Sequence, residues 1–296
     1  MRRREFLALA AATPAAAAVP DLSSRICLFT DHLAGFSYEE VARMLKDLGV
    51  TGPDLTVRRR GLVAPEKVAS ELPKAQAAFA KHNLSIPMIT TEITSVSDPD
   101  ALAVLETAAK LKITHYKLGY SRYGDLARWR ETIAETRTKL QELAKVNRRL
   151  GLHGGMHNHA GDSVGCCVWD NIQILDGVDE AAFGFYFDPA QATIEGGKLG
   201  WNLSFRRVMP RLVMVAIKDF VWEKSDKGWR TRWVPLGEGM VDWDAAIPLL
   251  KMATFSGPVS LHIEYDPGGR TQTERYDRAL ESAARDLRFL RAKLTA

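Results

Sequence analysis

The stretch VSLHIE, residues 259–264, alternates strictly between apolar and polar side chains. Successive side chains of a β-strand point to opposite faces, so one face of this strand would carry aliphatic residues and the other Ser260, His262 and Glu264. Three earlier stretches combine apolar and polar residues in the same way, and each ends in polar residues: 155–159, 184–188 and 214–218. The pattern predicts strands with one apolar face and one functional face.

Outward from these stretches, strand patterns alternate with helical patterns from residue 25 onward, and no Pro/Gly/Ser-rich linker marks a domain boundary. The predicted strands are 25–30, 54–57, 85–90, 115–119, 152–159, 183–188, 212–219 and 259–265. The predicted helices are 37–48, 65–82, one that starts at Asp98-Pro99, 126–150, 169–175, 201–209, 243–252 and 273–294.

This strand and helix order predicts the α/β class, as a single (β/α)8 barrel over residues 21–296. A doubly wound open sheet is the main alternative. It would normally carry a glycine-rich phosphate turn after the first strand, and the residues there, TDHLAG at 30–35, do not form one. In a barrel, the polar ends of the strands would converge on one pocket.

The composition excludes some classes of function. The chain has 296 residues, 46% of them hydrophobic and 26% charged, which is typical of a globular protein with a large core. Its formal charge is only +4, and part of that charge lies in Arg2, Arg3 and Arg4. We therefore expect no nucleic-acid partner.

The first 20 residues read as an export signal. Arg3-Arg4-Glu5-Phe6-Leu7 resembles the twin-arginine pattern, an alanine-rich apolar stretch follows to about residue 19, and small residues at 16–18 offer a cleavage site. A disordered basic N-terminus is the alternative. The apolar stretch is too short for a stable membrane span, and no later stretch is long and apolar enough. We expect a periplasmic or secreted mature protein without a membrane span.

The cysteines do not predict a disulfide framework. There are three, Cys27, Cys166 and Cys167, and adjacent cysteines rarely bridge each other. Incidental thiols are favoured over a redox or metal role.

Two carboxylates are the strongest candidates for a site. Asp188 and Glu264 each end an apolar strand, where a buried carboxylate needs a cation, a metal or hydrogen-bond donors. With His157 they would form a mixed nitrogen and oxygen set suited to Mn²⁺, Zn²⁺, Co²⁺ or Mg²⁺. The alternative is a network of ion pairs at the barrel mouth, with Lys218 and Arg58 as the cations.

Other polar residues on the functional faces could act with this set. His159 shares a strand face with His157, so one imidazole could bind a metal and the other a substrate oxygen. Lys218 could neutralise carboxylates, polarise a carbonyl or act as a base. His262 faces the histidines from the last strand, and both His262 and Arg58 could contact the substrate.

The segment after the seventh predicted strand is rich in tryptophan. Asp219 points away from the functional face, which predicts a role in tethering a loop. The rings of Trp222, Trp229, Trp233 and Trp243 could pack that loop or stack on a sugar, and packing is favoured.

On these residues the chain resembles the xylose isomerase-like barrel superfamily, and within it the exported sugar phosphate isomerase/epimerase proteins. The resemblance implies a pocket at the C-terminal ends of the strands, often with a divalent metal, and proton transfer next to a sugar carbonyl through an enediolate. The matching segments, weak singly but specific in this order, are GPDLTVR at 52–58, HNHAG at 157–161, DPAQATIEGG at 188–197, KDF at 218–220, PLGEG at 235–239 and HIEY at 262–265.

The resemblance is incomplete at the site. It places Asp188 and Glu264 at the ligand positions of the sixth and eighth strands, and His157 where many members have a glutamate. Ala216 stands where a histidine is usual, and Gln191, which we expect to contact substrate, replaces another. These departures predict weaker metal binding, with His262 as a further ligand or Lys218 supplying the positive charge.

The sequence therefore favours an isomerase or epimerase of a sugar or keto-sugar, working by metal-assisted proton transfer. The metal would be held by His157, Asp188 and Glu264, and Glu264, Lys218 or His159 would move the proton. Two alternatives stay open: a lyase or hydrolase of keto-glycosides in the same pocket, and a carbohydrate-binding barrel without catalysis. The substrate, the metal and the oligomeric state are not determined, and a homo-oligomer is compatible with the sequence.

Overall fold

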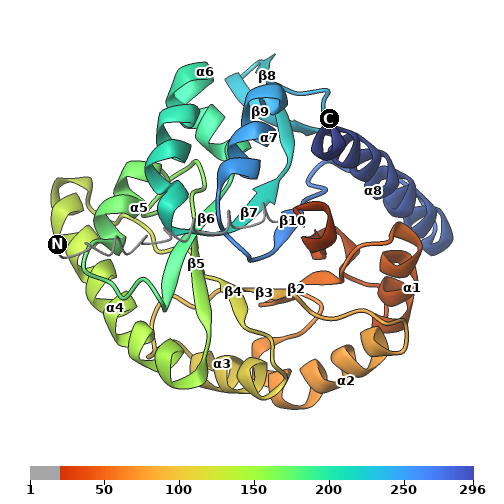
Figure 1. The fold of residues 1–296 in the computed structure, drawn as a ribbon, viewed down its shortest axis with the longest axis horizontal. Coiled ribbons are helices and arrows are strands. Elements are labelled where there is room, and N and C mark those ends of the chain that lie inside the picture. Colours follow the sequence, from red (N-terminus) through yellow and green to blue (C-terminus); the bar gives the residue numbers. More distant parts are fainter. Residues whose placement is uncertain (1–20) are drawn as a thin grey trace, which may run out of the picture.

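The computed structural model describes residues 21–296, and the predicted signal at 1–20 lies outside them. Parallel strands close into a barrel in the order β1-β10-β7-β6-β5-β4-β3-β2, with the helices outside, which confirms the predicted fold (Figure 1). The barrel strands are β1 Ile26–Phe29, β2 Pro53–Val57, β3 Met88–Thr91, β4 His115–Lys117, β5 His153–His157, β6 Phe183–Phe187, β7 Leu212–Ile217 and β10 Val259–Leu261.

Helices cover the outer surface of the barrel. Ser37 and Glu40 form a capping box at the start of α1, and Gly49 ends that helix in the left-handed conformation. Among residues 21–296, no helix is both long and apolar enough to cross a membrane. The helices are α1 Tyr38–Leu48, α2 Val68–Ala80, α3 Ala101–Lys110, α4 Trp129–Leu150, α5 Val168–Leu175, α6 Pro189–Val208, α7 Trp243–Met252 and α8 Gln272–Thr295.

The alternation seen in the sequence separates two cores. Val215 and Ile217 of β7 belong to the large core between the strands and the helices. Met214 and Ala216 of the same strand belong to a smaller cluster that also contains Tyr186. Each strand therefore presents one side to its covering helices and the other to the barrel interior, as predicted.

Helix α6 is much longer than the predicted helix 201–209. It starts at Pro189, because the Asp188 carboxylate accepts a hydrogen bond from the Gln191 backbone N–H at 3.0 Å and caps the first turn. The backbone is not helical at Gly197, where φ is 61° and ψ is −162°, so the helix kinks there. The first half of this helix was not predicted, because the two glycines at 196–197 are unfavourable in a helix interior.

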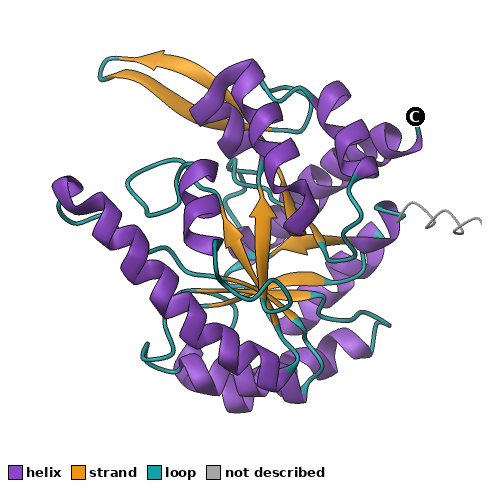
Figure 2. Ribbon diagram, turned by 60° about the vertical axis from the view of Figure 1, so that its left-hand side comes forward, coloured by secondary structure: helices purple, strands orange, loops and turns teal. Residues whose placement is uncertain are grey.

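The tryptophan-rich segment forms a hairpin that the sequence analysis did not predict. Strands β8 Asp219–Ser225 and β9 Gly228–Val234 pair antiparallel and project from the barrel (Figure 2). The Asp219 carboxylate accepts hydrogen bonds from the backbone N–H groups of Gly237 and Val241, and from the Trp243 indole at 2.9 Å. This confirms that Asp219 tethers the loop after β9.

Most barrel strands are shorter than predicted, and β3 and β10 are examples. Strand β3 starts at Met88 rather than residue 85, and the Pro87 just before it has no N–H to donate to a ladder. Strand β10 ends at Leu261, although the His262 N–H still donates to the Ile217 carbonyl at 2.9 Å. His262 and Glu264 therefore lie just beyond the ladder, at the mouth of the barrel.

Candidate active site

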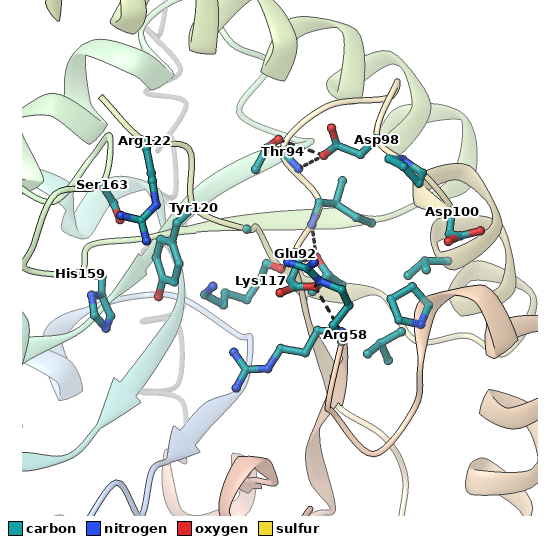
Figure 3. A pocket seen from close by; sticks show the side chains of 18 of the residues that line it. Arg58, Glu92, Thr94, Asp98, Asp100, Lys117, Tyr120, Arg122, His159 and Ser163 are labelled. Carbon is teal, nitrogen blue, oxygen red and sulfur yellow. Dashed lines mark hydrogen bonds and ion pairs between the residues drawn. The ribbon is translucent and has the colours of Figure 1, made fainter. Parts of the chain in front are cut away.

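Two adjoining cavities open at the C-terminal ends of the strands. One has a volume of about 870 Å³ and lies over the ends of β2 to β5, and the other, of about 560 Å³, extends to the end of β10. Both are lined by Arg58, Lys117, Tyr120 and His159 (Figure 3). His157, His262 and Glu264 line the second cavity. The barrel mouth thus gathers polar residues from several strands, as the sequence predicted.

A lysine joins the two predicted metal-binding carboxylates. The Lys218 ammonium lies 3.2 Å from Asp188 Oδ2 and 2.8 Å from Glu264 Oε1. Its nitrogen also lies 4.4 Å from the centre of the Trp233 ring, so a cation–π contact covers another side of the ammonium. Asp188 and Lys218 are fully buried and line neither cavity, whereas the Glu264 side chain is 24% exposed.

Electrostatics keep all three groups charged at neutral pH. Burial alone would raise the pKa of Asp188, but the Lys218 ammonium and the His157 ring outweigh it and lower the pKa to about 2. Burial likewise opposes ionisation of Glu264, and Lys218 and His262 bring its pKa well below the usual range. The two carboxylates overcome the burial of Lys218 and raise its pKa. Lys218 is therefore a permanent cation and an unsuitable base.

Both ring nitrogens of His157 are already engaged. Its Nε2 lies 3.2 Å from Asp188 Oδ2, and because that carboxylate is ionised, Nε2 carries the proton and donates it. Its Nδ1 then accepts a hydrogen bond of 2.6 Å from the Tyr120 hydroxyl. Burial lowers the pKa of His157 to about 3, so the ring is neutral.

His262 is held in the same manner. Its Nδ1 lies 3.2 Å from Glu264 Oε1 and its Nε2 lies 3.0 Å from the Tyr186 hydroxyl. Its ring stacks on Phe29 with a centroid distance of 4.3 Å. Below it, the fully buried Asp54 carboxylate accepts hydrogen bonds from other strands. His262 lines the cavity as predicted, but its ring nitrogens are used within the protein.

The donor set of His157, Asp188 and Glu264 does not fit a divalent metal as it stands. The Lys218 ammonium donates to both carboxylates, and His157 has no free nitrogen for a metal. Only one group of three His, Cys, Asp or Glu residues within 21–296 has all its ligand atoms within 4.8 Å of one another, and it lies elsewhere in the protein. A metal here would have to displace Lys218, so the predicted metal site stays a prediction that this arrangement disfavours.

His159 differs from His157 and His262 because one of its ring nitrogens is free. Its Nδ1 lies 3.0 Å from the Ala160 carbonyl and donates to it, which leaves Nε2 without a proton. Burial and the nearby Lys218 cation lower the pKa of His159, so the ring is neutral at pH 7. His159 lines both cavities, and its role in proton transfer stays a prediction.

Lys117, at the end of β4, is a candidate site residue that the sequence analysis missed. Its side chain is buried, and its amine lies 3.6 Å from the centre of the Tyr120 ring. Among residues 21–296, no acidic group lies within ion-pair distance of this amine. Burial, followed by the Arg58 cation, lowers the pKa of Lys117 from 10.5 to about 7. The amine is therefore a base at neutral pH, in contrast to Lys218.

Besides His262, the predicted substrate contacts are Arg58 and Gln191, and these two have different surroundings. Arg58 lines both cavities, and its guanidinium forms an ion pair with Asp31 and lies over the Phe29 ring. Gln191 is buried and lines neither cavity. Its Oε1 accepts a hydrogen bond of 3.0 Å from the Ala160 N–H. Gln191 thus positions the loop that carries His159.

Comparison with known proteins agrees with this fold. A family model described as xylose isomerase-like TIM barrel matches residues 42–293. The chain therefore belongs to the xylose isomerase-like TIM barrel family. Comparison with curated proteins gives no match.

Solved structures share the fold at low sequence identity. A xylose isomerase-like TIM barrel protein from Mycobacterium smegmatis, in complex with magnesium, has a TM-score of 0.68 and 15% identity, with 93% of this chain and 98% of that chain covered. A D-psicose 3-epimerase from Clostridium cellulolyticum, with D-tagatose, has a TM-score of 0.67 and 13% identity, covering 91% and 99%. A probable 3-DHS dehydratase from Bacillus anthracis has a TM-score of 0.65 and 15% identity, covering 90% and 98%.

Proposed function

We propose that the protein is an isomerase or epimerase of a sugar or keto-sugar that moves a proton at the carbon next to a carbonyl. The observation that carries the proposal is the Lys117 amine, which is nearly buried, has no carboxylate within ion-pair distance among residues 21–296, and opens on both cavities beside the neutral His159. Two neutral bases in one pocket suit a reaction that removes a proton and returns it.

The mechanism uses groups of this chain alone. Lys117 takes a proton from the carbon that bears a hydroxyl beside the carbonyl, which leaves an enediolate. Arg58 donates hydrogen bonds to the oxygen on which negative charge develops, and His159 carries a proton to or from the neighbouring oxygen. Return of the proton to the adjacent carbon gives an isomer, and return to the other face gives an epimer. No net oxidation or hydrolysis occurs.

Neither Glu264 nor Lys218 moves the proton in this scheme. Glu264 is too strongly stabilised as an anion to be an effective base, so we assign it to binding a substrate hydroxyl through its exposed oxygen. Lys218 compensates the charges of Asp188 and Glu264, a task that a divalent metal could perform in a relative with a free ligand set. We propose that the reaction does not depend on a metal at these carboxylates.

Family membership and the solved structures support the substrate class. The psicose 3-epimerase structures were determined with D-tagatose or with D-fructose, which are ketoses. These likenesses are below 25% identity, so the substrate of this protein is a proposal.

A second reaction is favoured by the size of the site. The two adjoining cavities, of about 870 and 560 Å³, share four lining residues and leave room beyond one sugar ring. An enediolate next to a leaving group can expel it, so the same bases could cleave a keto-glycoside.

Deuterium incorporation tests the proposal whichever isomer is formed. Ketoses, aldoses and keto-glycosides are incubated in D₂O with chelated protein, and NMR follows exchange at the carbon next to the carbonyl. We expect exchange with formation of an isomer, at rates unchanged by the chelator. Exchange with loss of an aglycone identifies the lyase instead. Saturable sugar binding without exchange contradicts both reactions and identifies a carbohydrate-binding barrel.

We also propose that the chain is one of the exported members of its family, with residues 1–20 as a twin-arginine signal and a periplasmic or secreted destination. Changing Arg3 and Arg4 to lysine is expected to leave the unprocessed precursor in the cytoplasm, as measured by fractionation and mass spectrometry. Unchanged processing of that variant contradicts the proposal.

A further inference from the structure

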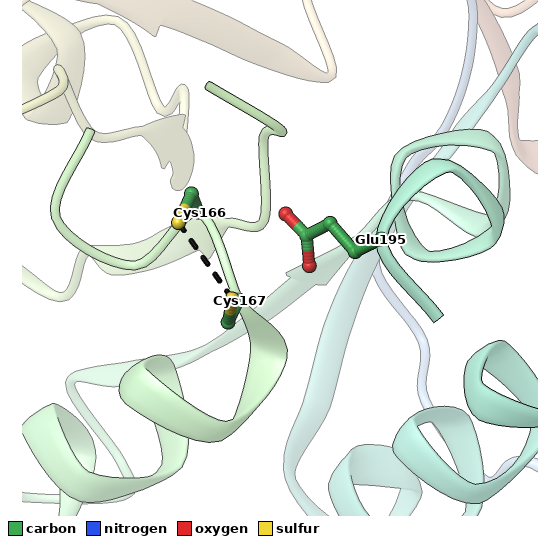
Figure 4. A group of neighbouring side chains, drawn as sticks. All are labelled: Cys166, Cys167 and Glu195. Atoms are coloured by element: carbon green, nitrogen blue, oxygen red, sulfur yellow. Dashed lines mark hydrogen bonds between the residues drawn. The ribbon is translucent and has the colours of Figure 1, made fainter. Parts of the chain in front are cut away.

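A cluster of two thiols and a carboxylate lies on the loop before α5 and on α6, away from the proton-transfer groups. Cys166 and Cys167 precede α5, and Glu195 lies on α6 just before its kink (Figure 4). Their ligand atoms all lie within 4.8 Å of one another, and among residues 21–296 they are the only such group. No step of the proposed reaction uses them.

The sulfur spacing fits a tetrahedral thiolate site. The Cys166 and Cys167 Sγ atoms are 3.7 Å apart, and both cysteines are free thiols. Two sulfurs bound to one tetrahedral zinc ion at about 2.3 Å each are separated by about 3.8 Å. Adjacent cysteines in this arrangement therefore need little movement to bind one ion. A carboxylate oxygen supplies a third ligand, and water can complete the tetrahedron.

The charges around the cluster also favour a cation. Within residues 21–296, Glu195 has no ion-pair partner, and its neighbours Cys166 and Asp170 are acidic groups. Asp170 is itself held by the Tyr123 hydroxyl at 2.6 Å. A divalent ion would supply the positive charge that the protein does not provide.

The loop that carries the thiols is closely packed. A Cβ at Gly165, whose φ is 79°, would lie 1.9 Å from the Asn171 side-chain oxygen, so the loop backbone rests directly against α5. The backbone that leads into the two cysteines is therefore held before any ion binds, and the exposed Cys167 side chain is open to an ion from solvent.

We propose that Cys166, Cys167 and Glu195 form a binding site for a soft divalent metal ion of the zinc or cadmium type. Binding releases the thiol protons to solvent and forms two metal–sulfur bonds and one metal–oxygen bond, with no change of oxidation state. The ion would fasten the loop that follows His159 to α6. This site is independent of the proposed function, because it shares no residue with the reaction.

Cadmium titration of the reduced full chain tests the site. Thiolate-to-cadmium charge transfer absorbs in the ultraviolet, so stoichiometry and affinity are read without an activity assay. We expect one equivalent in the wild type and in Cys27→Ala, which removes the buried third thiol. Cys166→Ser and Cys167→Ser are expected to lose the band, and Glu195→Gln to bind at least about tenfold more weakly.

The controls make each outcome decisive. Glu180→Gln removes an exposed carboxylate elsewhere and should bind like the wild type. Circular dichroism verifies that each variant is folded, and Cys167→Ala replaces Cys167→Ser if the latter is not. A band of full strength in either cysteine variant, no band in the reduced wild type, or unchanged affinity in Glu195→Gln overturns the proposed site.

Discussion

Replacing Lys218 by methionine is expected to lower the free energy of unfolding by about 3–5 kcal/mol at neutral pH, because the buried Asp188 and the largely buried Glu264 lose their shared cation. Lys218 is 2% exposed and Asp188 is fully buried, so water cannot replace the lost charge. Denaturation by urea at pH 7 measures the effect. Lys224→Met, which removes an exposed lysine of the nearby hairpin, is the matched control and should change stability little.

The pH dependence of the wild type follows from the same ion pairs. The folded pKa of Asp188, about 2, lies below its ordinary value of 3.8, so this carboxylate adds stability above pH 4 that is lost as the pH falls toward 2. Lys218, with a raised pKa, adds stability that persists to alkaline pH. In Lys218→Met the carboxylates can be protonated more easily, so the deficit relative to the wild type should shrink as the pH falls.

A further variant separates charge from packing. Lys218→Met combined with Asp188→Asn and Glu264→Gln removes all three charges and should recover part of the lost stability.

Elemental analysis of wild-type protein and of Asp188→Ala/Glu264→Ala tests the role of the lysine directly. One equivalent of metal that is present in the wild type and absent in that double variant would show that a metal, and not Lys218, balances these carboxylates.

The barrel and much of its mouth could be predicted because both depend on local alternation. Residues 259–264 show which side chains of the last strand face the pocket, and His262 and Glu264 do line it. The hairpin of β8 and β9 was missed because it is largely exposed and lacks a clear apolar face. Its two-residue turn at 226–227 was the available signal.

The chemistry of individual groups could not be predicted, because it depends on distances between strands. Lys117 and Lys218 both end barrel strands, and nothing local distinguishes them. In three dimensions Lys218 lies against two carboxylates, whereas Lys117 lies against an aromatic ring and near another cation. The Lys218 amine is therefore held protonated, whereas the Lys117 amine is close to neutral. The sequence analysis singled out Lys218 as a possible base, and the structure favours Lys117 instead.

Replacing Lys117 by methionine is expected to reduce the rate of proton exchange by about 10²- to 10⁴-fold, the usual contribution of a general base. In the wild type kcat/KM should rise with pH through about 7, because the amine must lose its proton before it can act. Exchange with the sugar found in the deuterium screen measures both. Lys110→Met, on an exposed position of α3, is the matched control.

A stability measurement tests the same lysine without a substrate. The shift of the Lys117 pKa from 10.5 to about 7 corresponds to about 5 kcal/mol, a cost that folding bears in full below pH 7 and not at all above about pH 10.5. Lys117→Met should therefore be more stable than the wild type at pH 6, and this advantage should fade as the pH rises to 10. If Lys117→Met is more stable than the wild type at pH 6 and no longer catalyses proton exchange, Lys117 is a base that the protein retains although it destabilises the fold. Lower stability at pH 6 would mean that the ammonium has a partner in the folded protein, and the assignment of Lys117 as the base would fail.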